Sequence, residues 1–245
     1  MTPGEARSAD GLIGRADLAG SSVPGEMATP AGIVVVLHGG REVSMRPVTA
    51  VDLPVLRMIP VARAIQHAVA GTGIAVWRHR FAVRGWNGDQ ASPARDLNRL
   101  LDDIQARYDG VHVFLAGHSM GARAAFRAAG HPAVCAVAGL APWLPAGEPV
   151  DQLAGRRVLL AHGSADTVTD PGDTWAYAAR ARAVTSVTAL EIRGGDHPML
   201  RRANLWHAVA AEFARVSFGL PAGPEPAAAA VRAASASEAG RITPV

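Results

Sequence analysis

A serine stands between two glycines in the segment 117–121, Gly-His-Ser-Met-Gly, which matches the pattern G-x-S-x-G. This pattern predicts a tight turn between a strand and a helix, with the hydroxyl of Ser119 at the start of the helix. There the helix dipole and the free amide groups favour developing negative charge. A serine hydroxyl becomes a useful nucleophile only when a base accepts its proton and an acid orients the base. Ser119 therefore needs a histidine and a carboxylate from elsewhere in the chain.

His197 is the candidate base, because it lies in the glycine-rich loop 194–198, between an expected strand and the last expected helix. Asp166 is the candidate acid, because it follows another expected strand directly. Two other carboxylates compete with it. Asp170 precedes a proline at an expected helix start, where capping explains it, and Asp196 adjoins the histidine and would point differently on an extended loop. We predict Asp166 as the acid.

The other histidines suit structural roles better. His67 and His207 fall within expected helices, His112 within a strand and His131 at a helix end. His118 adjoins the serine and is too constrained to serve as its base.

A second glycine-rich segment, His38-Gly39-Gly40, ends the first clear strand. Attack on an acyl group creates a tetrahedral oxyanion, which two backbone amides commonly stabilise. The amide of Met120, directly after the serine, is one predicted donor. The other should come from this segment, with Gly40 as the first choice and Arg41 as the next. Glycines here let the backbone approach a substrate closely.

The elements that position these residues alternate between strands and helices. Continuous apolar runs, typical of strands buried on both faces, predict strands at 33–37, 74–77, 111–115, 134–140, 157–161 and 186–192. Helical patterns follow at 61–70 after Pro60, from Ser92-Pro93 to Tyr108, at 122–129, from Asp170-Pro171 and at 205–216. The alternation predicts an α/β fold with a mostly parallel sheet of six to eight strands and helices on both faces. The three candidate residues then all lie at the carboxyl ends of strands.

Length and composition narrow the class of protein. The chain has 245 residues and a formal net charge of +3, and all its basic residues are arginines scattered along the sequence. Nucleic-acid binding is therefore not expected. No apolar run is long enough to span a membrane, and no signal peptide is apparent, so we expect no stable membrane insertion and a cytoplasmic location. The single cysteine, Cys135, excludes an internal disulfide and a multi-cysteine metal site.

Three regions are predicted. Residues 1–30 form a lead-in that could hold edge strands, and residues 31–218 form the catalytic domain. Residues 219–245 are rich in Pro, Ala, Gly and Ser, so we expect a disordered tail, although its alanines could form a frayed helix.

With these elements in order, the chain resembles the α/β-hydrolase superfamily over about residues 31–218, and is most similar to small bacterial esterases and to lysophospholipase-like or dienelactone-hydrolase-like members. The resemblance implies hydrolysis of an ester or thioester of a small molecule through an acyl-enzyme on Ser119, with no metal and no organic cofactor. Strict dienelactone hydrolases use a cysteine nucleophile and match less well. Larger members insert a cap domain after the strand that ends at Leu140. The segment that follows here is too short for one, so we expect an open site.

Several assignments stay open at this stage. Arg78, Arg80 and Arg84 could grip an acidic substrate group, but pairing with acids such as Asp89 and Asp96 is favoured, because arginines occur everywhere in the chain.

Arg41 and Trp143 are candidate pocket residues; Trp143 is equally suited to pack beneath a loop. The alternatives to a hydrolase are an acyltransferase of the same fold and, less favoured, a non-catalytic binding protein. The oligomeric state is not predicted.

Overall fold

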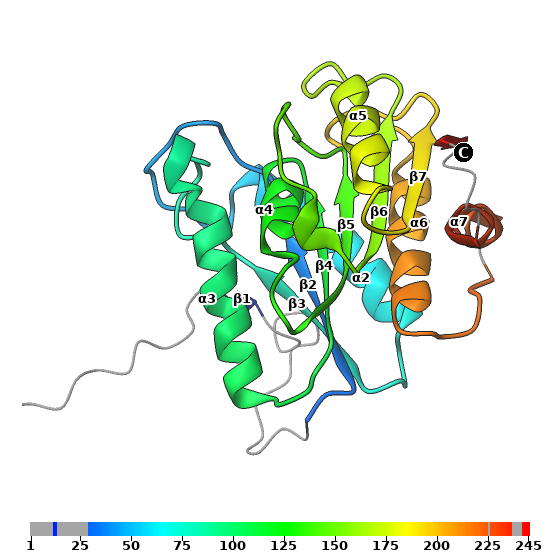
Figure 1. Cartoon of the computed structure of the whole chain (residues 1–245), viewed down its shortest axis with the longest axis horizontal. Coiled ribbons are helices and arrows are strands. Elements are labelled where there is room, and N and C mark those ends of the chain that lie inside the picture. Colours follow the sequence, from blue (N-terminus) through cyan, green and yellow to red (C-terminus); the bar gives the residue numbers. More distant parts are fainter. Residues whose placement is uncertain (1–11, 14–28, 225, 237–241) are drawn as a thin grey trace, which may run out of the picture.

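The computed structural model of this chain describes residues 12–13, 29–224, 226–236 and 242–245. An eight-stranded sheet runs through the middle in the order β1-β3-β2-β4-β5-β6-β7-β8 (Figure 1). Its strands are β1 (Leu12–Ile13), β2 (Gly32–Leu37), β3 (Ile74–His79), β4 (Val113–His118), β5 (Val134–Leu140), β6 (Arg157–Gly163), β7 (Val187–Ile192) and β8 (Ile242–Pro244). Only β1 pairs antiparallel, with β3; all other neighbours are parallel. The predicted mostly parallel sheet is confirmed.

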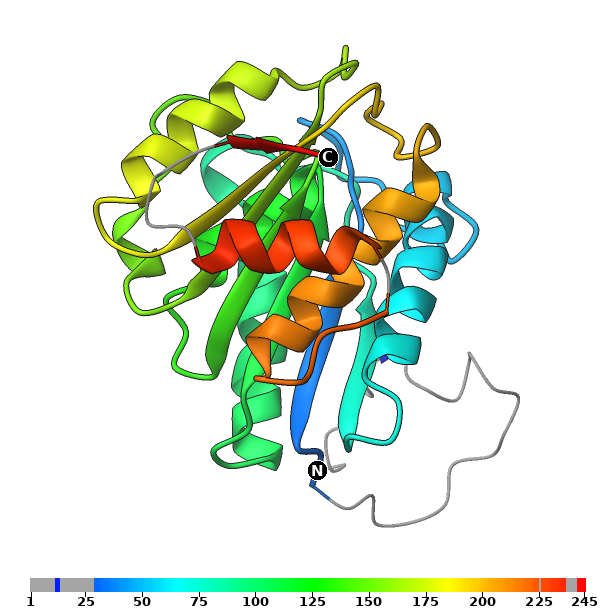
Figure 2. The ribbon, with the colours of Figure 1, turned by 90° about the vertical axis from the view of Figure 1, so that its right-hand side faces the viewer.

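Helices cover both faces of the sheet, as predicted. They are α2 (Leu53–Ala68), α3 (Ser92–Arg107), α4 (Met120–Ala128), α5 (Pro171–Ala181), α6 (Ala203–Ser217) and α7 (Pro226–Ala236). Two apolar cores result, one between the sheet and α3, α4 and α5, the other between the sheet and α2, α6 and α7 (Figures 1 and 2). Strands β2 and β4 are buried along their whole length, which explains the apolar runs 33–37 and 113–116.

Helix α2 starts earlier than the sequence indicates. It begins at Leu53, with Pro54 in its first turn, and Pro60 lies inside the helix instead of at its start. A proline inside a helix leaves the carbonyl four residues earlier without its usual donor. Here that residue is Leu56, and both Leu56 and Pro60 are exposed, so water can satisfy the carbonyl. The stop signal at Gly71 is used, since this glycine has a φ of +77° just past the helix.

The C-terminal segment differs from the expected disordered tail. Helix α7 crosses α6 (Figure 2), and its side chains Ala227, Val231 and Ala234 are buried in the core that it shares with α6. Arg232 donates to the buried carboxylate of Glu212 over 2.5 Å, and β8 adds to the sheet beside β7. The sequence did not predict this packing, because an alanine-rich segment shows no strong apolar periodicity. Its small side chains nevertheless let the helix approach its neighbour closely.

Two further expectations concern the ends of the domain. Of residues 1–30, the structure describes Leu12–Ile13, which form the edge strand β1, and 29–30; the rest lie outside the described residues. Between β5 and β6 the chain contains only a short 3₁₀ turn at Asp151–Leu153, so there is no large cap at this point, as predicted.

Candidate active site

Ser119 lies in the sharp turn between β4 and α4, with φ +54° and ψ −119°, a conformation that L-residues rarely adopt. The glycines around it allow this turn. A Cβ on Gly117 would collide with the backbone of Gly121, and a Cβ on Gly121 would collide with the carbonyls that end β2. The pattern G-x-S-x-G is thus required by close backbone contacts, and it holds the serine at the N-terminus of α4.

Three of the predicted residues come together in one chain of hydrogen bonds. Nε2 of His197 lies 3.1 Å from Oγ of Ser119, and Nδ1 of the same ring lies 2.8 Å from Oδ2 of Asp166. They come from the carboxyl ends of three different parallel strands, β4, β6 and β7. The two contacts orient the imidazole so that Nε2 faces the serine hydroxyl.

The carboxylate of Asp166 is fully buried and held by five donors or donor-capable groups. Burial alone raises the pKa of this carboxyl. Hydrogen bonds with His162 and His197 and from the amides of Val168 and Thr169 outweigh that effect and lower its pKa well below the usual value. The hydroxyl of Thr169 also donates to Oδ2, over 3.0 Å. The carboxyl group of Asp166 is therefore ionised and places a negative charge next to the imidazole of His197.

The competing carboxylates are engaged elsewhere. Asp170 caps α5, accepting a bond of 2.7 Å from the amide of Gly172. Asp196 accepts bonds of 2.9 Å from the amides of Leu200 and Arg201 in its own loop. Each therefore stabilises local backbone structure.

Sequence reasoning missed two neighbours of the acid. His162 is completely buried, 3.0 Å from Asp166 through Nε2 and 2.7 Å from the hydroxyl of Thr174 through Nδ1. Thr169 lies 3.1 Å from Nδ1 of His197 as well. The one available signal was the position of His162 at the end of β6, four residues before Asp166.

The backbone near the serine offers two amides suited to an oxyanion. Within the described residues, neither the amide of Met120 nor that of Gly40 has an acceptor. A Cβ on Gly40 would collide with the Met120 side chain and with the carbonyl of Arg84, so the two loops are in direct contact. Arg41, the alternative donor, is excluded, because its amide already donates to the carbonyl of Arg84 over 2.8 Å.

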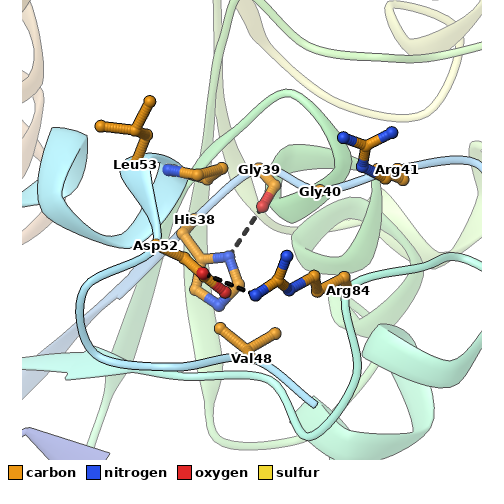
Figure 3. Close-up of a pocket in the computed structure, with 9 residues that line it drawn as sticks. His38, Gly39, Gly40, Arg41, Val48, Asp52, Leu53 and Arg84 are labelled. Atoms are coloured by element: carbon orange, nitrogen blue, oxygen red, sulfur yellow. Dashed lines mark hydrogen bonds and ion pairs between the residues drawn. The ribbon is translucent and has the colours of Figure 1, made fainter. Parts of the chain in front are cut away.

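A cavity of about 440 Å³ opens beside this glycine loop (Figure 3). Its lining includes Arg41, Val48 and Leu53, together with an ion pair of 2.7 Å between Arg84 and Asp52. Ser119 itself is not among the lining residues.

The strip 39–41 separates the serine from this cavity: a Cβ on Gly39 would lie 3.2 Å from Cβ of Ser119, and Gly39 also lines the cavity. The cavity and the serine therefore lie on either side of the same short backbone segment.

Trp143 is not part of the cavity lining. Its ring lies edge-on to the ring of Trp86. The guanidinium of Arg123 lies 4.5 Å from the centre of the Trp143 ring and 4.0 Å from that of Trp86. The buried carboxylate of Glu148 binds that same guanidinium. Since the amide of Trp143 donates to the carbonyl of Ser119 over 3.3 Å, this cluster fixes the loop after β5 beside the serine.

Of the three arginines Arg78, Arg80 and Arg84, the last forms an ion pair with an acid, as the favoured interpretation expects, but with a different partner. Arg84 pairs with Asp52, a residue that the sequence did not single out. Asp96, the predicted partner, instead lies 3.4 Å from His79 and accepts a bond from the amide of Ala82.

A comparison with known protein families agrees with the observed fold, a mostly parallel sheet with helices on both faces. The family model of the alpha/beta hydrolase domain matches residues 58–216, and the chain belongs to this family. A search of curated proteins found no match.

Solved structures share the fold at low identity. An alpha-beta serine hydrolase homologue from Coxiella burnetii has a TM-score of 0.57 and 16% identity, covering 77% of this chain and 87% of that one. Est1E from Butyrivibrio proteoclasticus gives 0.57 and 14%, over 80% and 92% of the two chains. XC6422 from Xanthomonas campestris, described as a serine hydrolase without lid, gives 0.53 and 20%, over 82% and 88%.

The described part of the chain contains no cluster of three or more His, Cys, Asp or Glu side chains that could hold a metal ion. None of its helices has both the length and the apolar character needed to cross a membrane.

Proposed function

We propose that this protein cleaves a carboxylic ester or thioester through an acyl-enzyme on Ser119. The observation that carries the proposal is the continuous hydrogen-bond series from the Ser119 hydroxyl through His197 to the buried carboxylate of Asp166. Membership of the alpha/beta hydrolase family supports hydrolase chemistry in general.

In the proposed reaction, Nε2 of His197 removes the proton of the Ser119 hydroxyl as the oxygen attacks the substrate carbonyl. The carbonyl π bond opens, and the negative charge moves to its oxygen, where the amides of Met120 and Gly40 donate hydrogen bonds. The intermediate collapses, and His197 gives its proton to the leaving alcohol or thiol. Asp166 stabilises the imidazolium that exists between these two proton transfers.

Water completes the cycle in the same way. His197 removes a proton from a water molecule that attacks the acyl-enzyme, and Ser119 leaves as its alcohol when the second tetrahedral intermediate collapses. The absence of a large cap between β5 and β6 favours access of water to the acyl-enzyme, and thus hydrolysis over transfer to another acceptor.

A fluorophosphonate probe tests the nucleophile directly. The wild-type protein should take up one equivalent, and Ser119→Ala should take up none and lose at least about a thousandfold in ester cleavage. Ser217→Ala, at the far end of α6, is the matched control and should label normally. A folded wild-type protein that neither labels nor cleaves any p-nitrophenyl ester or thioester of graded acyl length would refute the proposal.

The same assay separates hydrolysis from acyl transfer. With an alcohol or amine acceptor added, a hydrolase should still release mainly the free acid. Predominant formation of the acylated acceptor would identify an acyltransferase that uses the same residues.

A further inference from the structure

The cavity beside the glycine loop has an uneven charge. Four of its lining residues carry ionisable side chains: His38, Arg41, Asp52 and Arg84. Arg84 and Asp52 neutralise each other across 2.7 Å. His38 is uncharged near neutral pH, since burial lowers its pKa to about 4. One net positive charge is left, on Arg41.

Three other arginines near the site form ion pairs with buried or partly buried carboxylates. Arg123 and Arg127 bind Glu148, and Arg84 binds Asp52. The guanidinium of Arg41 is exposed and has no hydrogen-bond or ion-pair partner among the described residues.

The backbone of Arg41 is nevertheless fixed on both sides. Its amide donates to the carbonyl of Arg84 over 2.8 Å, and its carbonyl accepts from the amide of Trp86 over 2.9 Å. It directly follows Gly40, the predicted oxyanion donor (Figure 3). The structure thus fixes the backbone of an unpaired cation directly after Gly40, so that its side chain starts from the wall of the cavity.

The rest of the cavity is apolar enough to accept a short carbon chain. Val48, Leu53 and Pro54 line it, and no acid in the lining is left unpaired to repel an anion. An arginine is well suited to bind a carboxylate or phosphate, because its guanidinium can donate two parallel hydrogen bonds.

We infer that the substrate of this site is an anionic ester or thioester, one whose acyl or alcohol part carries a carboxylate or phosphate that Arg41 binds across the glycine loop. This inference rests on the proposed function and names its substrate class. Arg41 would then determine specificity without taking part in bond making or breaking.

Matched substrates test it. The 4-nitrophenyl half-ester of glutaric acid and 4-nitrophenyl valerate have similar chains, but only the first is an anion. For anions on the leaving-group side, an acyl ester of glycerol phosphate is compared with the same ester of glycerol. The wild-type protein should favour the anionic member of at least one pair by about tenfold in kcat/KM, as expected for one charge-assisted hydrogen-bonded contact.

Arg41→Gln should remove this preference by raising KM for the anionic ester, while the neutral ester and the rate of fluorophosphonate labelling stay unchanged. Arg41→Lys should retain part of the preference. Arg46→Gln is the matched control, an exposed arginine on the same loop that does not line the cavity, and should behave as wild type.

Three outcomes are distinguishable. A preference that disappears in Arg41→Gln supports the inference and shows by its pair which part of the substrate is charged. Equal rates for both members of both pairs, or a preference that survives in Arg41→Gln, overturn it while ester cleavage stands. A wild-type protein that neither labels nor cleaves any ester refutes the proposed function itself, and the inference with it.

Discussion

Nε2 of His118 lies 2.8 Å from the backbone carbonyl of His197, and the two rings are 4.9 Å apart. A carbonyl can only accept, so Nε2 carries the proton and His118 donates. The opposite edge of the ring faces Gly39, where an added Cβ would lie 3.0 Å from Nδ1. One buried side chain thus connects the serine turn, the glycine loop and the histidine loop.

We predict that His118 positions His197 for its contact with Ser119. His118→Phe keeps a ring but leaves the buried carbonyl of His197 without its donor, and should slow fluorophosphonate labelling and kcat by about 10–100-fold with little change in KM. His118→Gln, whose amide can donate to the same carbonyl, should restore most of the rate. A folded Phe variant with the wild-type labelling rate would contradict the prediction.

Asp166→Asn should lower kcat by a factor on the order of 10³–10⁴, because a neutral amide no longer stabilises the imidazolium of His197. Asp170→Ala is its control. That change removes the cap of α5 and should lower the free energy of unfolding by about 1 kcal/mol, with kcat unchanged. Steady-state kinetics and urea unfolding on both variants measure the two effects. If Asp170→Ala were the slower enzyme, the acid would have to be reassigned.

Gly40→Ala should lower kcat by about a hundredfold, because the new methyl group collides with the backbone carbonyl of Arg84 as well as the Met120 side chain and displaces an oxyanion donor. The control is Gly71→Ala, where nothing lies within 4 Å but φ is +77°. It should cost about 1 kcal/mol of stability and leave kcat alone. Full activity in Gly40→Ala would argue against this loop as an oxyanion donor.

As the pH falls, the free energy of unfolding should begin to decrease well above the pKa values of carboxyl groups in the unfolded chain. Burial lowers the pKa of His38 to about 4 and that of His118 to about 3, from 6.5. Below pH 6.5 the unfolded chain therefore binds protons that the folded chain does not, so the free energy of unfolding decreases as the pH falls. Asp166, whose pKa is depressed by folding, adds a further loss only near and below its unfolded value of about 3.9.

Urea unfolding between pH 7 and 5 measures this effect in the window where the histidines dominate. We expect a loss of roughly 1–2 kcal/mol per buried histidine by pH 5. His118→Gln should show a smaller loss, since one of the buried histidines whose pKa is lowered is gone. An identical pH dependence in the variant would show that His118 is not buried in its neutral form.

Sequence reasoning indicated which residues lie together in the candidate site where a short motif or a strand end determines backbone geometry. Ser119 could be placed because Gly117 and Gly121 permit only one kind of turn, and Asp166 and His197 because strand ends in a parallel sheet converge. Asp170 could be set aside because a following proline explains it as a cap.

What the sequence did not reveal depends on contacts between distant segments. Nothing local indicates that Asp52 would pair with Arg84, that Glu148 would bind Arg123, or that His118 would bind the carbonyl of His197. The sequence also allowed the amide of Arg41 as an oxyanion donor, but in the structure this amide donates to the carbonyl of Arg84.

Strand β8 has a consequence for self-association. Without it, β7 would present a row of open amide and carbonyl groups to other molecules. β8 covers β7 through parallel pairing, and Val245 accepts from the amide of Arg193 over 3.1 Å. Pro244 has no amide hydrogen to offer, so the new border of the sheet is a poor template for a further strand. The last residues described therefore disfavour edge-to-edge aggregation at this border of the sheet, close to the loop that carries His197.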